Sequence, residues 1–183
     1  MQIQELSFGS LENNKSRIFL AECNQFTNSF DILQYVLYNY FDINIGEADL
    51  YYGKYGKPYL KNNKVYFNIS HSGKYIVLAV SSKEIGVDIQ LVKSKVCWTN
   101  LFLEDEHNLV KNSHSNDSLG FSILWSCKES YLKKTGFGLS IEHSTVLFDS
   151  INSPIYYDEN FIKWTVLTKD NEQYVISLCL GED

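Results

Sequence analysis

The segment L-W-S-C-K-E-S-Y-L-K-K, residues 124–134, has the spacing of an amphipathic helix that carries a charge within its apolar stripe. At about 100° per residue, one stripe contains Phe121, Leu124, Trp125, Tyr131 and Leu132. Lys128 falls near the middle of that stripe. Burying a lone ammonium costs several kcal/mol. The Lys128 side chain must therefore extend to solvent or meet an anion.

Glu129 and Lys133 lie together at the edge of the same stripe, four residues apart. An acidic and a basic residue at this spacing stabilise a helix by about 0.2–0.5 kcal/mol, so the pair needs no function. If the helix borders a cleft, a bound polyphosphate would be the anion that meets Lys128, and Glu129 would lie beside it as a metal ligand or base. From the helical periodicity alone, both interpretations stay open.

Working outward from this helix, the predicted elements repeat in the same order. Residues 30–41 and about 97–111 are expected to be helical, and the predicted strands are 64–70, 74–82, 83–92, 145–150, 161–167 and 173–180. Each half of the chain has a helix, a glycine-bearing turn, and strands that close on a similar segment, K-Y-I-V-L-A-V-S-S or Q-Y-V-I-S-L-C-L-G. This order predicts a duplicated α+β unit with halves at 1–85 and 86–183. A ligand cleft is expected between them.

The predicted strand around G-V-D-I-Q (86–90) alternates apolar and polar residues, as half-buried strands do. Asp88 and Gln90 therefore share a face, about 6.5–7 Å apart along the strand. Both side chains offer oxygen, which Mg²⁺ prefers as a ligand. An aspartate on the solvent face of a strand is the simpler alternative.

A second candidate site lies in F-N-I-S-H-S-G (67–73), where a strand runs into a turn with Ser70, His71 and Ser72. Hydroxyl, imidazole and turn amide groups can together bind phosphate oxygens. A hydrogen-bonded turn without a ligand is the alternative.

Composition narrows the class of protein. A chain of 183 residues with 44% hydrophobic and 15% aromatic residues has enough apolar surface for a folded core. The net charge of −6 and the single arginine argue against a nucleic-acid partner. No apolar run reaches the roughly 18 residues of a membrane span, and no secretory signal is evident. Four scattered cysteines without metal-ligand spacing favour reduced thiols in a cytoplasmic protein. We expect a monomer.

Four motifs together resemble the surfactin-type 4'-phosphopantetheinyl transferase family. They are G-K-P (56–58), F-N-I-S-H-S-G (67–73), G-V-D-I-Q (86–90) and W-S-C-K-E-S-Y-L-K (125–133), in the family's order and approximate spacing. The last agrees with the family motif W-S-x-K-E-S/A-x-x-K at every fixed position. The resemblance covers about residues 30–140 well and the C-terminal strands loosely.

This resemblance implies an enzyme that transfers the phosphopantetheine arm of coenzyme A to a serine of an apo carrier protein. The reaction would need Mg²⁺ and release adenosine 3',5'-bisphosphate. It also implies two halves related by a pseudo-twofold axis, with coenzyme A between them and the metal site in the second half.

Residue roles follow from the matched motif positions. Asp88 and Glu129 would bind Mg²⁺, Gln90 would complete its ligands directly or through a water, and Glu129 would help remove the serine proton. Lysines 128 and 133 would neutralise pyrophosphate charge during transfer. The coenzyme A phosphates would also bind Lys57, Ser70 and His71.

The chain departs from the family pattern at two places. Gln90 stands where most relatives carry a second acid, and the N-terminal segment offers only Lys15 and Arg17 where relatives place basic residues. A coenzyme A-binding homologue that no longer catalyses transfer is therefore the main alternative. A serine hydrolase built on Ser72 is disfavoured, because I-S-H-S-G lacks the first glycine of G-x-S-x-G.

Overall fold

The computed structural model describes residues 2–8, 16–23, 28–61, 65–94, 102–113, 116–137 and 145–181. Its strands are β1 (Ile3–Leu6), β2 (Arg17–Glu22), β3 (Leu50–Tyr52), β4 (Pro58–Leu60), β5 (Tyr66–Ser72), β6 (Tyr75–Ser81), β7 (Ile85–Leu91), β8 (Ile155–Tyr157), β9 (Asn160–Lys169) and β10 (Glu172–Gly181). Its helices are α1 (Ser29–Phe41), α2 (Glu104–Ser113) and α3 (Asp117–Thr135), with a short 3₁₀ turn at Glu47–Asp49.

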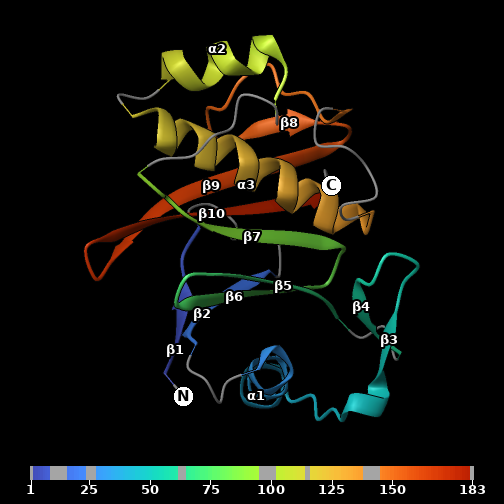
Figure 1. Ribbon diagram of the computed structural model, residues 1–183. Helices are drawn as coiled ribbons and strands as arrows, with labels where there is room; N and C mark the ends of the chain where they lie inside the picture. Colours follow the sequence, from blue (N-terminus) through green and yellow to red (C-terminus); the bar gives the residue numbers. More distant parts are fainter. Residues whose placement is uncertain are drawn as a thin grey trace.

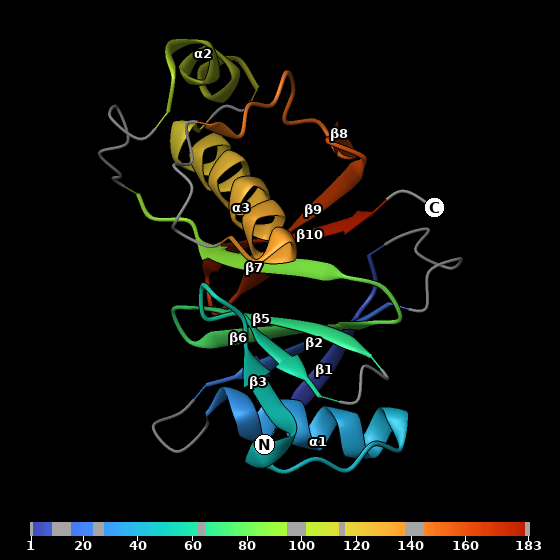
Figure 2. The same ribbon diagram turned by 90° about the vertical axis from the view of Figure 1, so that its right-hand side faces the viewer.

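Two four-stranded antiparallel sheets lie face to face between helices (Figure 1). Helix α1 covers the outer face of the sheet ordered β1-β2-β6-β5, which we call the N-terminal sheet. Helix α3 covers the sheet ordered β7-β10-β9-β8, the C-terminal sheet, and α2 packs outside α3. Figure 2 shows the same layers from the side, with β7 next to β5. Ligand sites favour such a seam between layers.

Strand periodicity explains the layers. In β6, Val77 and Ala79 belong to the apolar cluster between the sheets, whereas Leu78 and Val80 belong to the cluster under α1. Consecutive side chains of a strand point to opposite faces, so a strand that is apolar at every position must be covered on both sides. Strand β6 is buried at every position, and β10 is buried from Tyr174 to Leu180.

Both sheets contain the same three-strand arrangement. The order is β2-β6-β5 in one and β7-β10-β9 in the other, with every pair antiparallel. Helix α1 follows β2 in the chain, and helices α2 and α3 follow β7. The α+β class predicted from the sequence is confirmed.

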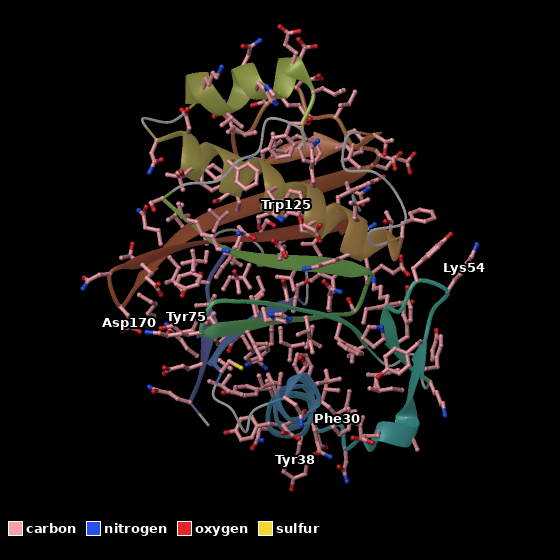
Figure 3. All side chains as sticks on the ribbon, in the orientation of Figure 1. Phe30, Tyr38, Lys54, Tyr75, Trp125 and Asp170 are labelled. Carbon is pink, nitrogen blue, oxygen red and sulfur yellow. The ribbon has the colours of Figure 1, made fainter. Side chains whose placement is uncertain are left out.

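The tips of two hairpins join the sheets at one end. Tyr75 donates a hydrogen bond to Asp170 at 3.2 Å, and the Lys74 ammonium lies 3.7 Å from the same carboxylate. Figure 3 labels Tyr75 and Asp170, which lie next to each other at this edge of the molecule. The Tyr75 and Tyr174 rings meet edge to face with centroids 5.1 Å apart.

Some predicted boundaries differ from the structure. Residues 145–150 form no strand, because the alternating Val146 and Phe148 fill the core beside α3 without pairing to the sheet. The helix predicted over 97–111 is observed only from Glu104, and residues 95–101 lie outside the described ranges. Strands β1–β4 and β8 were not predicted. Among the described residues, no helix has the length and hydrophobicity needed to cross a bilayer.

Candidate functional site

Strand β7 lies at the edge of the C-terminal sheet, and both of its faces are buried. Val87 and Ile89 point into the core between the sheets, as the period-two pattern predicts. Asp88 occupies the opposite face, on which α3 packs, and is only 4% exposed. The solvent-facing alternative for Asp88 is therefore wrong. The pattern could not reveal this, since a covering helix adds no feature to the strand's own sequence.

Gly86 allows α3 to approach β7 this closely. A Cβ atom at residue 86 would lie 1.9 Å from the carbonyl oxygen of Ser130 and 2.5 Å from the backbone nitrogen of Lys134. The backbones of the helix and the strand are therefore in direct contact. This contact brings the α3 residues Glu129 and Lys133 next to Asp88, two residues beyond Gly86.

One oxygen of the Asp88 carboxylate is tightly bound by two side chains. Ser70 of β5 donates a hydrogen bond to Asp88 Oδ1 at 2.7 Å, and the Lys133 ammonium lies 2.5 Å from the same oxygen. Lys133 also donates to Ser70 Oγ at 2.7 Å. Burial raises the pKa of Asp88 above its ordinary value, although Lys133 and Ser70 act in the opposite direction.

The other oxygen of Asp88 is suited to a ligand. Asp88 Oδ2 is buried and has no hydrogen-bond partner among the described residues. Buried polar atoms are normally paired, so an orphaned carboxylate oxygen needs an explanation. Glu129 is the nearby second carboxylate, with Oε2 4.0 Å from the Lys133 ammonium and a side chain 15% exposed.

These features fit a divalent cation that keeps several waters. The described ranges contain no cluster of three or more His, Cys, Asp or Glu residues placed to hold a metal. Two carboxylates with waters suit Mg²⁺, which dehydrates reluctantly. Gln90, on the same strand face as Asp88, donates its amide to the Leu91 carbonyl at 3.1 Å.

Side chains of β5 hold the edge of β7 in place. The Val87 amide donates to Asn68 Oδ1 at 2.8 Å, and the Leu91 amide donates to Ser72 Oγ at 2.9 Å. Together with Ser70, these are alternate residues of one strand, so all three point to the same side. The two sheet edges are thus joined by side chains. The contacts at Val87 and Leu91 lie on either side of Asp88 along β7, and they fix its position.

A cavity of about 190 Å³ adjoins this group at the seam. Its lining comes from the β3–β4 connection, β5 and the end of α3: Tyr55, Gly56, Lys57, Pro58, Asn68, Ile69, Lys133 and Gly136. Two lysines from segments distant in sequence therefore face one hollow. Lys133 connects the hollow with the Asp88 carboxylate.

Lys57 is held against the C-terminus of α3. Its ammonium donates to the Lys134 carbonyl at 2.7 Å, one of the carbonyls left open at a helix end. Gly136, with φ 76°, ends the helix as predicted, and its amide donates to the Leu132 carbonyl. Burial is the main reason why the pKa of Lys57 falls to about 8.

Two other predicted residues lie outside this group. His71 follows Ser70 on β5 and therefore points to the opposite face of the strand, where its side chain is exposed. Arg17 pairs with Glu5 at 2.8 Å and stacks against Tyr40, so its guanidinium is bound by the N-terminal sheet and α1. Lys15 is not among the described residues.

Lys128 requires a correction. Its side chain is fully buried, and its ammonium lies 2.5 Å from Glu106 Oε1 of α2 and 4.9 Å from the Phe102 ring centroid. The anion that meets this ammonium is a protein carboxylate, in place of the phosphate expected from sequence. Lys128 is therefore not in the group around Asp88. Burial lowers its pKa, and Glu106 opposes that effect.

Asn68 and Glu106 were not predicted from the sequence, and Ser72 was expected in a phosphate-binding turn, not as the partner of the Leu91 amide. The alternation N-x-S-x-S within F-N-I-S-H-S was a signal for Asn68, because it places Asn68 on one strand face with Ser70 and Ser72. For Glu106 no local signal exists. Its partner lies 22 positions away on another helix, and only packing brings them together.

Comparison with known proteins agrees with the motifs. The family model of the 4'-phosphopantetheinyl transferase superfamily matches residues 84–179, about half of the chain. The chain is 37% identical over 138 residues to a 4'-phosphopantetheinyl transferase of Bacillus subtilis, covering 69% of this chain and 60% of that protein.

Two further relatives show similar agreement. The transferase gsp of Aneurinibacillus migulanus is 31% identical over 142 residues, or 74% of this chain and 55% of that protein. The transferase HetI of Nostoc sp. is 30% identical over 145 residues, or 74% of this chain and 61% of that protein. The chain thus spans a little over half the length of these relatives. From the family model, the relatives and the four motifs, the chain belongs to the 4'-phosphopantetheinyl transferase superfamily, a family of enzymes.

Proposed function

We propose that the protein transfers the 4'-phosphopantetheine arm of coenzyme A to a serine of an apo acyl, polyketide or peptidyl carrier protein. The observation that carries this proposal is the buried Asp88 carboxylate, with one oxygen unpartnered beside a cavity lined by two lysines. Oxygen ligands for a divalent cation and ammonium groups for phosphates are the parts that phosphoryl transfer needs.

The cation would be held by Asp88 and Glu129, with Gln90 or a water as a further ligand. When bound, Mg²⁺ supplies positive charge that offsets the charge of the pyrophosphate. Ser70 orients Asp88 through its 2.7 Å hydrogen bond and thereby contributes to the site without needing to touch a phosphate. This differs from the direct phosphate contact that the resemblance implied for Ser70.

The proposed reaction forms one bond and breaks one. The carrier serine oxygen attacks the phosphorus that bears the pantetheine arm, and the bond from that phosphorus to the bridging oxygen breaks. Adenosine 3',5'-bisphosphate leaves with the bridging oxygen. Glu129, directly or through a water, accepts the serine proton. Lys57 and Lys133 bind the phosphates from the cavity side, and the exposed His71 side chain contacts coenzyme A.

We further propose that the halves, 1–85 and 86–183, are related by a pseudo-twofold axis and that the metal site belongs to the second. The shared strand order supports this, as does the contact between Tyr75 and Tyr174. These tyrosines occupy matching places near the starts of β6 and β10. Equivalent residues touch each other only close to a twofold axis. A monomeric cytoplasmic protein is part of the same proposal.

The test is the mass of an apo carrier protein after incubation with the protein, coenzyme A and Mg²⁺. We expect the carrier to gain one phosphopantetheine arm, and we expect Asp88→Asn to reduce the rate at least a hundredfold, because it removes a metal-binding charge. Omitting the metal and adding EDTA should stop transfer. If coenzyme A binds and no carrier is modified, the chain is the noncatalytic binding homologue.

Lys57 should make coenzyme A binding depend on pH. Its pKa of about 8 means that its ammonium loses its proton in the ligand-free protein as the pH rises through that value. A nearby phosphate favours the charged form, so binding should be tighter below pH 8 and about tenfold weaker well above it. Calorimetric titration of coenzyme A between about pH 7 and 9.5 measures this change.

Lys57→Arg is the matched control, because a guanidinium stays charged over the whole range. Its affinity for coenzyme A should vary less with pH than that of the wild type. Equal pH dependence in the two proteins would show that another group is responsible.

A further inference from the structure

We propose that the Lys133 ammonium is the counter-ion of Asp88 in the ligand-free protein and that a divalent cation binds only by displacing it. This inference rests on the proposed function, because the displaced ammonium is expected to move to a phosphate of coenzyme A. Metal and coenzyme A binding would then be coupled through one side chain.

The contacts of Lys133 support the first half of this exchange. Its ammonium lies 2.5 Å from Asp88 Oδ1, 2.7 Å from Ser70 Oγ and 4.0 Å from Glu129 Oε2. It thus lies beside both carboxylates, Asp88 and Glu129, that would bind the metal. In the part of the chain that the structure describes, no other cationic side chain forms an ion pair with Asp88.

The negative charge of the buried Asp88 carboxylate must be balanced by a nearby cation in every state of the protein. A buried carboxylate without a cation is strongly disfavoured, so Asp88 holds its ammonium until another cation arrives. A divalent cation at the same carboxylates is repelled by an ammonium a few ångströms away, and screening is weak because Asp88 is buried. The ligand-free protein should therefore bind metal poorly while Lys133 remains in place.

The cavity provides a second position for the ammonium. Lys133 is 26% exposed on a flexible stem and already lines the hollow that Lys57 faces. A phosphate in this hollow attracts the ammonium and releases Asp88 for the metal. By linkage, coenzyme A then strengthens metal binding, and the metal strengthens coenzyme A binding by the same factor.

The decisive measurement is the affinity of the ligand-free protein for Mn²⁺ alone, followed by electron paramagnetic resonance at one mildly alkaline pH. We expect Lys133→Gln to bind Mn²⁺ at least tenfold more tightly than the wild type, since no ammonium has to be displaced. Lys134→Gln removes the same charge from the neighbouring position on α3 and should stay within about twofold of the wild type.

Lys133→Arg and Lys133→Met separate charge from shape. The arginine variant keeps a cation and should bind Mn²⁺ as weakly as the wild type. The methionine variant should bind Mn²⁺ as Lys133→Gln does, and it is used in place of Lys133→Gln if that protein does not fold.

Melting curves give an independent readout. Without metal, Lys133→Gln should melt below the wild type, and Mn²⁺ should raise its melting temperature more.

Mn²⁺ affinity that is unchanged or weaker in both neutral variants overturns the inference, as does tighter binding in Lys134→Gln by the same factor. Absence of Mn²⁺ binding to every protein also overturns it. The proposed function is judged separately, by the mass of the carrier protein with the wild type. Lys133→Gln should be slow in that assay even though it binds metal tightly.

Discussion

Gly86→Ala is expected to destabilise the protein by about 3 kcal/mol or more and to reduce transfer at least a hundredfold. The added methyl carbon would lie 1.9 Å from a backbone oxygen of α3, so the helix or the strand must shift. Overpacking that involves the backbone costs at the high end of its usual range. A displacement of about 1 Å between reacting groups can by itself cost a hundredfold in rate.

Chemical denaturation and the carrier-modification assay measure the two effects. Gly181→Ala is the matched control, because among the described residues a Cβ at this glycine of β10 meets only the end of the Lys134 side chain, at 3.7–3.9 Å. It should change stability by less than about 0.5 kcal/mol. A Gly86→Ala protein with wild-type stability and rate would contradict the close contact between α3 and β7.

Breaking the buried pair of Lys128 and Glu106 is the second change with a large expected effect. Lys128→Met removes the ammonium that faces the Glu106 carboxylate, and Glu106→Leu removes the carboxylate that faces the ammonium. Each single change should cost about 3–5 kcal/mol, since one charge of the buried pair is removed and the other stays buried. The double variant should recover to within about 2 kcal/mol of the wild type, because both charges are gone.

The double variant also tests the role of Lys128. If this lysine only joins α3 to α2, the folded double variant should transfer the arm at a rate within about threefold of the wild type. A loss of a hundredfold with a stable fold would return Lys128 to the phosphate-binding residues. Single and double variants should be compared by denaturant unfolding before their rates are measured.

Several features could be predicted from the sequence because they depend on local pattern. The alternation around Val87 and Asp88 identified a strand, its apolar face and the carboxylate that Ser70 and Lys133 contact. The spacing of α3 identified a helix that ends at Gly136. The four motifs identified the family, which the family model and the relatives support independently.

Only tertiary packing determined which charged side chains form ion pairs with each other. Glu129 and Lys133 form the helical pair that their spacing predicts, but at 4.0 Å this contact is longer than the 2.5 Å contact of Lys133 with Asp88. Lys128 and Lys133 belong to the same motif and had the same expected role, yet one meets Glu106 and the other Asp88.

The physical reason is that an ion pair forms with whatever charge the fold brings within a few ångströms, whatever its position in the chain. Helical periodicity predicts on which face of the helix a lysine lies, and strand periodicity predicts on which face of the strand an aspartate lies. The sequence by itself therefore determined α3 and β7, the apolar face of each, and the family. Only the packing of α3 against β7 on one side and α2 on the other determined which lysine meets the carboxylate of the site.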